Sequence, residues 1–196
     1  MPRVANRIEQ SERISRAVWE VLAESGPQGL TLRAVAKKAD CTTGLVLHRF
    51  PDKSSLLIHA RELLHQRTAE RTDRLETLGG EPIKVLRSVL MEAVSLTKEK
   101  QQEARVWLGY LAAALSNDEL ATRHVKANQV FFDRIQRLVT NVQPKWDVDM
   151  IFSTTTTLVA LVEGLNALST VDYELYSPET QARAVDRALG IFGLTK

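Results

Sequence analysis

The chain has 196 residues, of which 44% are hydrophobic and 26% charged, and its net charge is +2. This composition predicts a folded protein of one or two domains, and no apolar run approaches the roughly 18 uninterrupted residues of a membrane span. One cysteine, Cys41, excludes an internal disulfide, and four scattered histidines do not supply a metal site. We therefore expect a cytoplasmic protein without a signal peptide, metal or cofactor, and with no membrane partner.

Positive charge is concentrated towards the N-terminus. Residues 1–53 carry nine Lys or Arg against six Asp or Glu, whereas residues 54–196 carry seventeen against eighteen. The first segment thus has a net charge of +3 and the second of −1. The bias is small, but it suits an anionic partner of the N-terminal segment.

The first two predicted helices are separated by a clear breaker. Apolar residues from Ile14 to Leu22 recur every three or four positions, which predicts a helix that ends at Ser25-Gly26-Pro27. Thr31 can cap a second helix, because its hydroxyl can accept a hydrogen bond from a free backbone N–H. A short turn at 39–41 follows, and Asp40 is a residue type that tolerates left-handed backbone.

A third, short helix is predicted from the cap Thr42 to about Phe50-Pro51, because the residue before a proline disfavours helical geometry. Asp52 or Lys53 then opens a long fourth helix. Two short helices joined by a tight turn form a helix-turn-helix, whose second helix enters the major groove of DNA. A plain helical hairpin within a bundle is the alternative that spacing alone allows.

Residues 8–60 resemble the N-terminal domain of the tetracycline-repressor (TetR) family of transcriptional regulators. The resemblance implies an all-α fold of about nine helices, with a helix-turn-helix DNA-binding domain at 1–53 and a helical effector-binding and dimerisation domain at 54–196. The matching residues, in the order of the family pattern, are Gly29, Thr31, Ala36, Ala39, Thr42, Gly44, Phe50, Lys53 and Leu56.

The chain departs from the family pattern at two positions. Asp40 stands where the family usually has a glycine in the turn, which is a mild change. Leu47 stands where the family usually has a tyrosine that contacts phosphate, and leucine has no hydrogen-bonding group. Arg49 can supply a charged phosphate contact instead.

The expected roles on DNA divide into phosphate contacts and base reading. Thr31, Lys53 and the N-terminal amides of the fourth helix should hold phosphates, since a helix N-terminus favours anions. Thr43 and Leu45 should face base edges, the first with a hydroxyl and the second with an apolar surface for a thymine methyl. Gly44 should allow close approach, and His48 is more often a packing or capping residue at such a position. The full predicted set is Thr31, Thr42, Thr43, Gly44, Leu45, Leu47, His48, Arg49 and Lys53.

Five further helices are predicted at 82–101, 104–115, 119–142, 147–169 and 178–192. The helix at 147–169 is rich in apolar residues and threonine and poor in charge, so it should be buried on most sides. Together with the amphipathic last helix it resembles the pair through which TetR regulators dimerise, which implies a homodimer through the last two helices. Burial within a monomer is the alternative.

The segments "RVWLGYLAAAL" and "VEGLNAL" resemble the subgroup of the family that includes choline-responsive repressors. We expect a small-molecule effector in the C-terminal domain, where an aromatic pair with a carboxylate can hold a cation. Ordinary core aromatics and a structural carboxylate are the alternative interpretation. The candidate contacts are Trp107, Tyr110, Leu111, Asn128, Phe131, Val159 and Glu163.

Motifs for catalysis are missing from the sequence: it has no Gly-rich phosphate loop, nucleophile elbow or Cys–His pair at suitable spacing. We therefore expect a regulator and not an enzyme. The most consistent function is a ligand-responsive repressor that binds an inverted-repeat operator in double-stranded DNA as a dimer and is released by a small molecule. A helical ligand-carrying or scaffolding protein without specific DNA binding is the alternative from another class.

Overall fold

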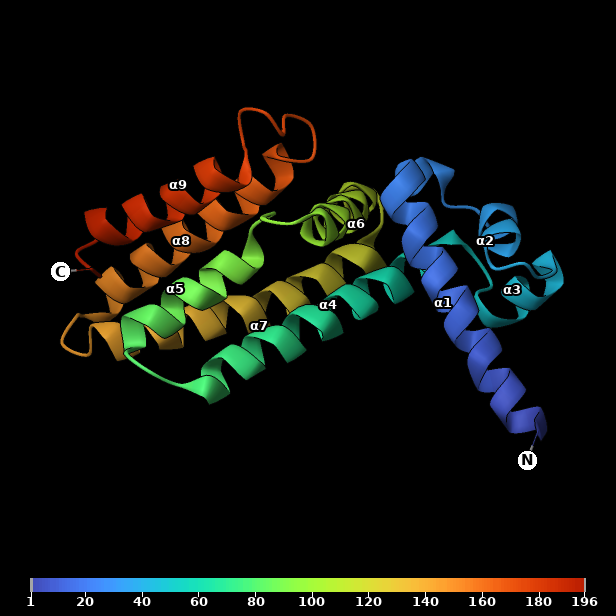
Figure 1. Cartoon of the computed structure of the whole chain (residues 1–196), viewed down its shortest axis with the longest axis horizontal. Helices are drawn as coiled ribbons and strands as arrows, with labels where there is room; N and C mark the ends of the chain where they lie inside the picture. The colour runs from blue at the N-terminus through green and yellow to red at the C-terminus, as the bar shows by residue number, and fades with distance from the viewer. Residues whose placement is uncertain (1, 196) are drawn as a thin grey trace. The chain divides into compact units, whose positions relative to one another are not determined.

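The computed structural model describes residues 2–195, with side chains described from residue 9 onwards, and within that range it is all helical (Figure 1). The expected all-α class is confirmed. The helices are α1 (Pro2–Gly29), α2 (Leu32–Lys38), α3 (Thr43–Arg49), α4 (Lys53–Leu78), α5 (Pro82–Ala93), α6 (Lys98–Ala114), α7 (Asp118–Val142), α8 (Val148–Leu168) and α9 (Pro178–Ile191).

The described residues fall into two compact units, which we call the N-terminal unit (2–65 and 105–122) and the C-terminal unit (66–104 and 123–195). This division differs from the expected boundary at residue 53. The physical reason is that Leu56, Leu57 and Ala60 of α4 are buried in the core of the N-terminal unit. Along the chain, α4, α6 and α7 each begin in one unit and end in the other.

In the N-terminal unit, α2 and α3 pack beside α1, and the second half of α6 joins their core (Figure 1). The expected breaker acts at Gly26, whose φ of 64° interrupts α1 before a last short turn. At Gly109 of α6, an added Cβ would lie 3.1 Å from Pro27 Cδ and 3.3 Å from Leu22 Cδ1. A larger residue at this position would force the side chain of Pro27 or Leu22 to shift by a few tenths of an ångström.

The helix-turn-helix itself has the predicted local chemistry. The hydroxyl of Thr31 accepts a hydrogen bond from Ala34 N at 3.1 Å, and that of Thr42 accepts one from Leu45 N at 3.3 Å. Between the two helices Asp40 adopts left-handed backbone, with a φ of 48°. The two predicted caps and the left-handed turn residue are confirmed.

In the C-terminal unit, α5, α8 and α9 pack on one another around an aliphatic core. The helices α7, α8 and α9 match the predicted ranges to within one residue at each end. The predicted helix at 82–101 is wrong, because α5 ends at Ala93 and α6 begins at Lys98. In the break between them, the backbone N–H of Ser95 donates to the side-chain oxygen of Gln181 on α9 at 2.9 Å.

The most apolar helix, α8, is exposed more widely than the sequence predicts. Its length and apolar composition would allow it to cross a membrane, but the core helices of soluble proteins have the same properties. In its most apolar 18-residue stretch, 33% of the residues are buried. It packs against α5 and α9 and also meets α7, where the rings of Phe132 and Phe152 lie 5.4 Å apart, so one face belongs to the core. The expectation that it is buried on most sides is wrong for the single chain, where Val148, Met150, Phe152 and Leu168 are exposed.

Candidate nucleic-acid interface

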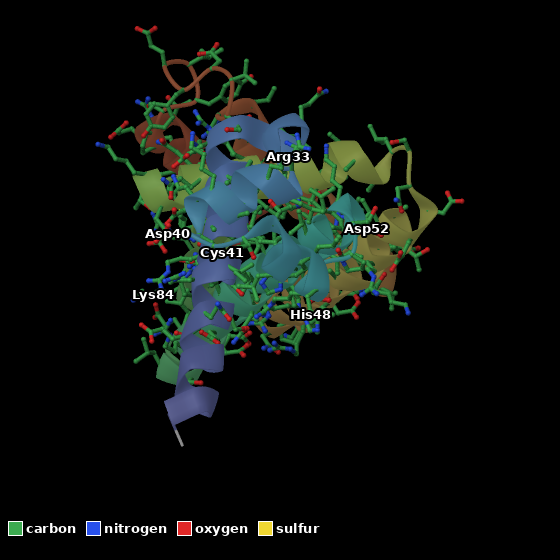
Figure 2. All side chains as sticks on the ribbon, turned by 90° about the vertical axis from the view of Figure 1, so that its right-hand side faces the viewer. Arg33, Asp40, Cys41, His48, Asp52 and Lys84 are labelled. Atoms are coloured by element: carbon green, nitrogen blue, oxygen red, sulfur yellow. The ribbon has the colours of Figure 1, made fainter. Side chains whose placement is uncertain are left out.

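The outer face of α3 is open, as a DNA-reading helix requires. Val46 is completely buried and fixes the rotation of α3 against the core. Thr43, Gly44 and His48 are exposed, and Leu47 keeps 49% of its surface exposed. Because residues four apart on a helix are neighbours, positions 43 and 47 and positions 44 and 48 form one continuous face. Figure 2 shows His48 on α3, which follows the turn at Asp40 and Cys41.

Gly44 lies on this face, and the packing of the chain does not explain why a glycine occupies this position. A Cβ added to Gly44 would meet no atom within 4 Å, so packing within the chain does not require glycine there. Leu45, in contrast, is only partly exposed and packs against the core of the N-terminal unit. Leu45 therefore offers less surface to a base than the sequence predicts, whereas the missing side chain of Gly44 leaves space for a base.

Both capping threonines keep a donor for DNA. The Oγ1 atoms of Thr31 and Thr42 accept backbone N–H groups, and a hydroxyl that accepts still has its own proton to donate. Thr31 and Thr42 are both exposed. Each hydroxyl can therefore cap its helix and donate to a phosphate oxygen at the same time.

The start of α4 presents one cation and one acid. Lys53 is the first residue of the helix and is exposed. The neighbouring Asp52 accepts a hydrogen bond from Ser55 N at 2.8 Å, and Asp52 N donates to Ser55 Oγ at 3.3 Å. One of the amides expected to hold a phosphate, that of Ser55, is thus taken by Asp52, whereas the side chain of Lys53 is exposed.

Two other basic residues near the motif are occupied by the protein itself. Lys38 Nζ lies 2.7 Å from Glu24 Oε1 and 3.6 Å from Glu20 Oε2, and the hydrogen bond to Glu24 is the main cause that raises the lysine pKa. Arg13 Nη2 donates to the carbonyl oxygen of Asp40 at 3.0 Å. These contacts tie α2 and the turn to α1, so Lys38 and Arg13 support the motif.

The predicted effector residues divide between the two units. Trp107, Tyr110 and Leu111 belong to the N-terminal unit. Tyr110 is 1% exposed, and its hydroxyl donates to the carbonyl oxygen of Leu120 at 3.0 Å. Trp107 is partly buried against the same core. The aromatic pair therefore has a structural environment within its own unit.

The other four predicted effector residues belong to the C-terminal unit. Asn128 Nδ2 donates to Glu163 Oε1 at 3.3 Å and lies 3.1 Å from His124 Nε2, so α7 and α8 contribute to one polar cluster. Phe131 and Val159 are partly buried against the core of that unit. Among the described residues, no group of three or more His, Cys, Asp or Glu has the arrangement of a metal site.

Comparison with known families agrees with this architecture. Residues 14–60 match the family described as bacterial regulatory proteins, tetR family, and residues 82–192 match the BetI-type transcriptional repressor C-terminal family. The chain belongs to the TetR family. Its class, a ligand-responsive DNA-binding regulator and not an enzyme, is therefore confirmed.

Individual relatives support the TetR assignment. The transcriptional regulator BetI of Stenotrophomonas maltophilia is 30% identical over 143 residues, which are 72% of this chain and 69% of BetI. The regulator PksA of Bacillus subtilis is 27% identical over 114 residues, 58% of this chain but only 56% of PksA. A regulator from Saccharomonospora viridis, solved in complex with choline, shares the fold with a TM-score of 0.85 at 17% identity, over 93% of this chain and 96% of that one.

One polar cluster of this TetR regulator was missed by sequence reasoning. Ser15 Oγ lies 2.8 Å from His59 Nε2 and 3.4 Å from Arg49 Nη2, which joins α1, α4 and the end of α3. Burial is the main cause that lowers the pKa of His59 to about 4, and the charge of Arg49 lowers it further. No sequence pattern indicates the cluster, because Arg49 and His59 lie 34 and 44 positions from Ser15 in the sequence.

Proposed function

We propose that this regulator binds an inverted-repeat operator as a homodimer, acting in the cytoplasm, and that a small molecule bound in the C-terminal unit releases it. The observation that carries the proposal is the open face of α3, formed by positions 43, 44, 47 and 48 on a helix that is capped by Thr42 and fixed against the core by the buried Val46. A short helix held at a fixed angle with one open face is what reading the major groove requires.

The DNA contacts have two kinds of role in this proposal. Lys53, Arg49 and the hydroxyls of Thr31 and Thr42 contact phosphates, since all four residues are exposed and can donate hydrogen bonds. Thr43, Gly44, Leu47 and His48 meet base edges. The exposed apolar side chain of Leu47 suits contact with a thymine methyl better than the partly buried Leu45 does.

Dimerisation through α8 and α9 is supported by the surface of α8. Positions 152, 156, 160, 164 and 168 follow one another every four residues and so form one ridge that winds gradually around the helix. Phe152 and Leu168 are 54% and 49% exposed at the two ends, and the positions between them carry only threonine, alanine and glycine. Such a stripe lets a second α8 approach closely, with the two recognition helices about 34–36 Å apart on DNA.

The effector site is proposed around the Asn128–Glu163 hydrogen bond, with Phe131 and Val159 as its apolar wall. A small, partly apolar molecule can displace the Asn128 side chain and bind the carboxylate of Glu163 in its place. An aromatic ring beside a carboxylate suits a cation such as the choline held by the Saccharomonospora viridis protein. Because α4, α6 and α7 each continue from one unit into the other, a shift in the C-terminal unit has a covalent route to the DNA-binding unit.

Fluorescence anisotropy with DNA from upstream of the protein's own gene tests the function directly. We expect tight binding to one inverted repeat, at least about 1,000-fold weaker binding to random DNA at the same salt concentration, and release by an effector found in a thermal-shift screen. Equal binding to all DNA, or none, would instead favour a ligand-carrying or scaffolding protein. An effector that changes operator affinity should do so by about 5- to 150-fold, and operator should weaken effector binding by the same factor.

A further inference from the structure

The hydroxyl of Ser15 makes three hydrogen bonds, which is all that a hydroxyl can make: it donates one and accepts two. Its oxygen lies 3.0 Å from the carbonyl oxygen of Ser11, 2.8 Å from His59 Nε2 and 3.4 Å from Arg49 Nη2. A carbonyl oxygen can only accept, so all three bonds form together when the single proton of Ser15 goes to Ser11. In that arrangement His59 and Arg49 both donate to Ser15.

This arrangement assigns a tautomer to His59. Its Nε2 carries the hydrogen, and a neutral ring with a proton on Nε2 satisfies the three contacts. Burial keeps the ring neutral, because it lowers the pKa of His59 to about 4. A neutral ring also avoids a second positive charge beside the guanidinium of Arg49. His59 thus holds the Ser15 oxygen in place with a bond of ordinary length, and the longer bond from Arg49 is added to it.

Arg49 is held from a second side by the ring of Phe50. The central carbon of its guanidinium lies 5.4 Å from the Phe50 ring centroid, and that ring lies 5.0 Å from the His59 ring. Arg49 is the last residue of α3 and is exposed, and the bond to Ser15 uses one of its five N–H groups. Two weak contacts restrict a long side chain before any partner arrives, which reduces the conformational entropy it loses on binding.

We propose that Ser15 and His59 are positioning residues for Arg49, which they hold at the end of the recognition helix for contact with a DNA phosphate. The inference rests on the DNA-binding function proposed above. It assigns to α1 and α4 a part in DNA affinity although Ser15 and His59 are both partly buried.

The test is a double-mutant cycle on operator affinity, measured by anisotropy at several salt concentrations. Arg49→Ala removes the phosphate contact, Ser15→Ala removes the central acceptor, and His59→Leu removes the donor at similar volume. His59→Gln keeps an N–H near the position of Nε2. Ser116→Ala is the matched control, because its hydroxyl is exposed in the same unit and bonds only to a local carbonyl.

We expect Arg49→Ala to weaken operator binding about 10-fold and to reduce the slope of log affinity against log salt by about one. Ser15→Ala and His59→Leu should each weaken binding about 3- to 10-fold and lower the slope part of the way, but change affinity less than about 2-fold when Arg49 is already alanine. His59→Gln should recover most of the loss, and Ser116→Ala should match the wild type.

Equal losses with and without Arg49 would overturn the inference and leave Ser15 and His59 with a merely structural role. The same conclusion follows if the two variants lower only the unfolding temperature and leave the salt slope unchanged. If His59→Leu fails to fold, the pair His59→Gln and Ser15→Ala decides the result. If the wild type binds operator and Arg49→Ala has the same salt slope as the wild type, the inference is wrong but the proposed function stands. If the wild type binds no DNA, both the proposed function and the inference are wrong.

Discussion

The side-chain oxygen of Gln181 accepts a hydrogen bond from the backbone N–H of Ser95 at 2.9 Å, across 86 positions of sequence. Gln181 is completely buried on α9. Its nitrogen donates to the carbonyl oxygen of Tyr176 at 2.8 Å and reaches that of Ser95 at 3.5 Å. One side chain therefore satisfies the backbone groups left free where α5 ends and before α9 begins, which buried peptide groups require.

Replacing Gln181 by leucine should lower the free energy of unfolding by about 2–4 kcal/mol, because at least two buried backbone groups lose their partner while the volume stays similar. Urea unfolding measures the change. The matched control is Gln102→Leu at an exposed position of α6, which should stay within about 0.5 kcal/mol of the wild type. A loss below about 1 kcal/mol for Gln181→Leu would mean that water replaces these bonds.

Features of the fold that depend on near neighbours were predictable from the sequence, and those that depend on remote contacts were not. The caps Thr31, Thr42 and Ser177 each accept from an amide three residues ahead, so composition and spacing identify them. The left-handed turn at Asp40 is equally local. The break after Ala93 was not predicted, because an apolar periodicity continues through it and the group that stabilises it lies on α9.

The candidate site divides in the same way. The exposed positions of α3 follow from helical periodicity once Val46 is known to face inwards. Tyr110 was expected beside an effector. The spacing of the aromatic residues on α6 does not identify the helices that pack over Tyr110, and in the structure it belongs to the core of the N-terminal unit. The contact between Ser15 and His59 depends on the packing of α1 against α4, which no local pattern encodes.

Acid should destabilise the protein through His59. Its pKa is about 4 in the folded protein, below the value of 6.5 for a free histidine, so between these two pH values the unfolded chain binds more protons. The stabilisation is complete above about pH 6.5 and falls as the pH approaches 4. After allowance for the exposed part of the ring, the loss should be about 1–2 kcal/mol.

Chemical unfolding of the wild type and of His59→Gln at pH 7 and pH 4.5 measures this loss. Carboxylates titrate alike in both proteins, so the difference between their pH dependences belongs to the histidine. The variant should lose less stability than the wild type over this range. Parallel pH dependences would show that His59 is as well solvated when folded as when unfolded.

Lys53 and Thr43 should affect DNA binding in different ways. Lys53→Ala should weaken binding to operator and to random DNA alike and lower the salt slope by about one, because it removes a phosphate contact. Thr43→Ala should change which operator bases are preferred and leave the slope unchanged. Lys84→Ala is the control. Lys84, which is labelled in Figure 2, is an exposed lysine of α5, and its Nζ lies 2.8 Å from Glu81 Oε2. A changed base preference in Lys53→Ala, with its salt slope intact, would contradict this division of roles.

The centre of the α8 stripe should control dimerisation. Thr156 donates its hydroxyl to the carbonyl oxygen of Phe152 at 2.9 Å, which leaves its methyl group for packing, and an added Cβ at Gly164 would meet nothing within 4 Å. Ala160→Arg places a charge between them and, in a two-fold symmetric dimer, opposite its own copy.

The dissociation constant of the dimer should rise at least about 100-fold in Ala160→Arg, because the charge is desolvated without a partner. Light scattering at micromolar concentration should then report a monomer that keeps the helical circular dichroism of the wild type, since position 160 is exposed in the single chain. Ala112→Arg makes the same substitution at an exposed alanine of α6 and should remain dimeric. A dimeric Ala160→Arg would move the interface away from α8, and a monomeric wild type would exclude the dimer itself.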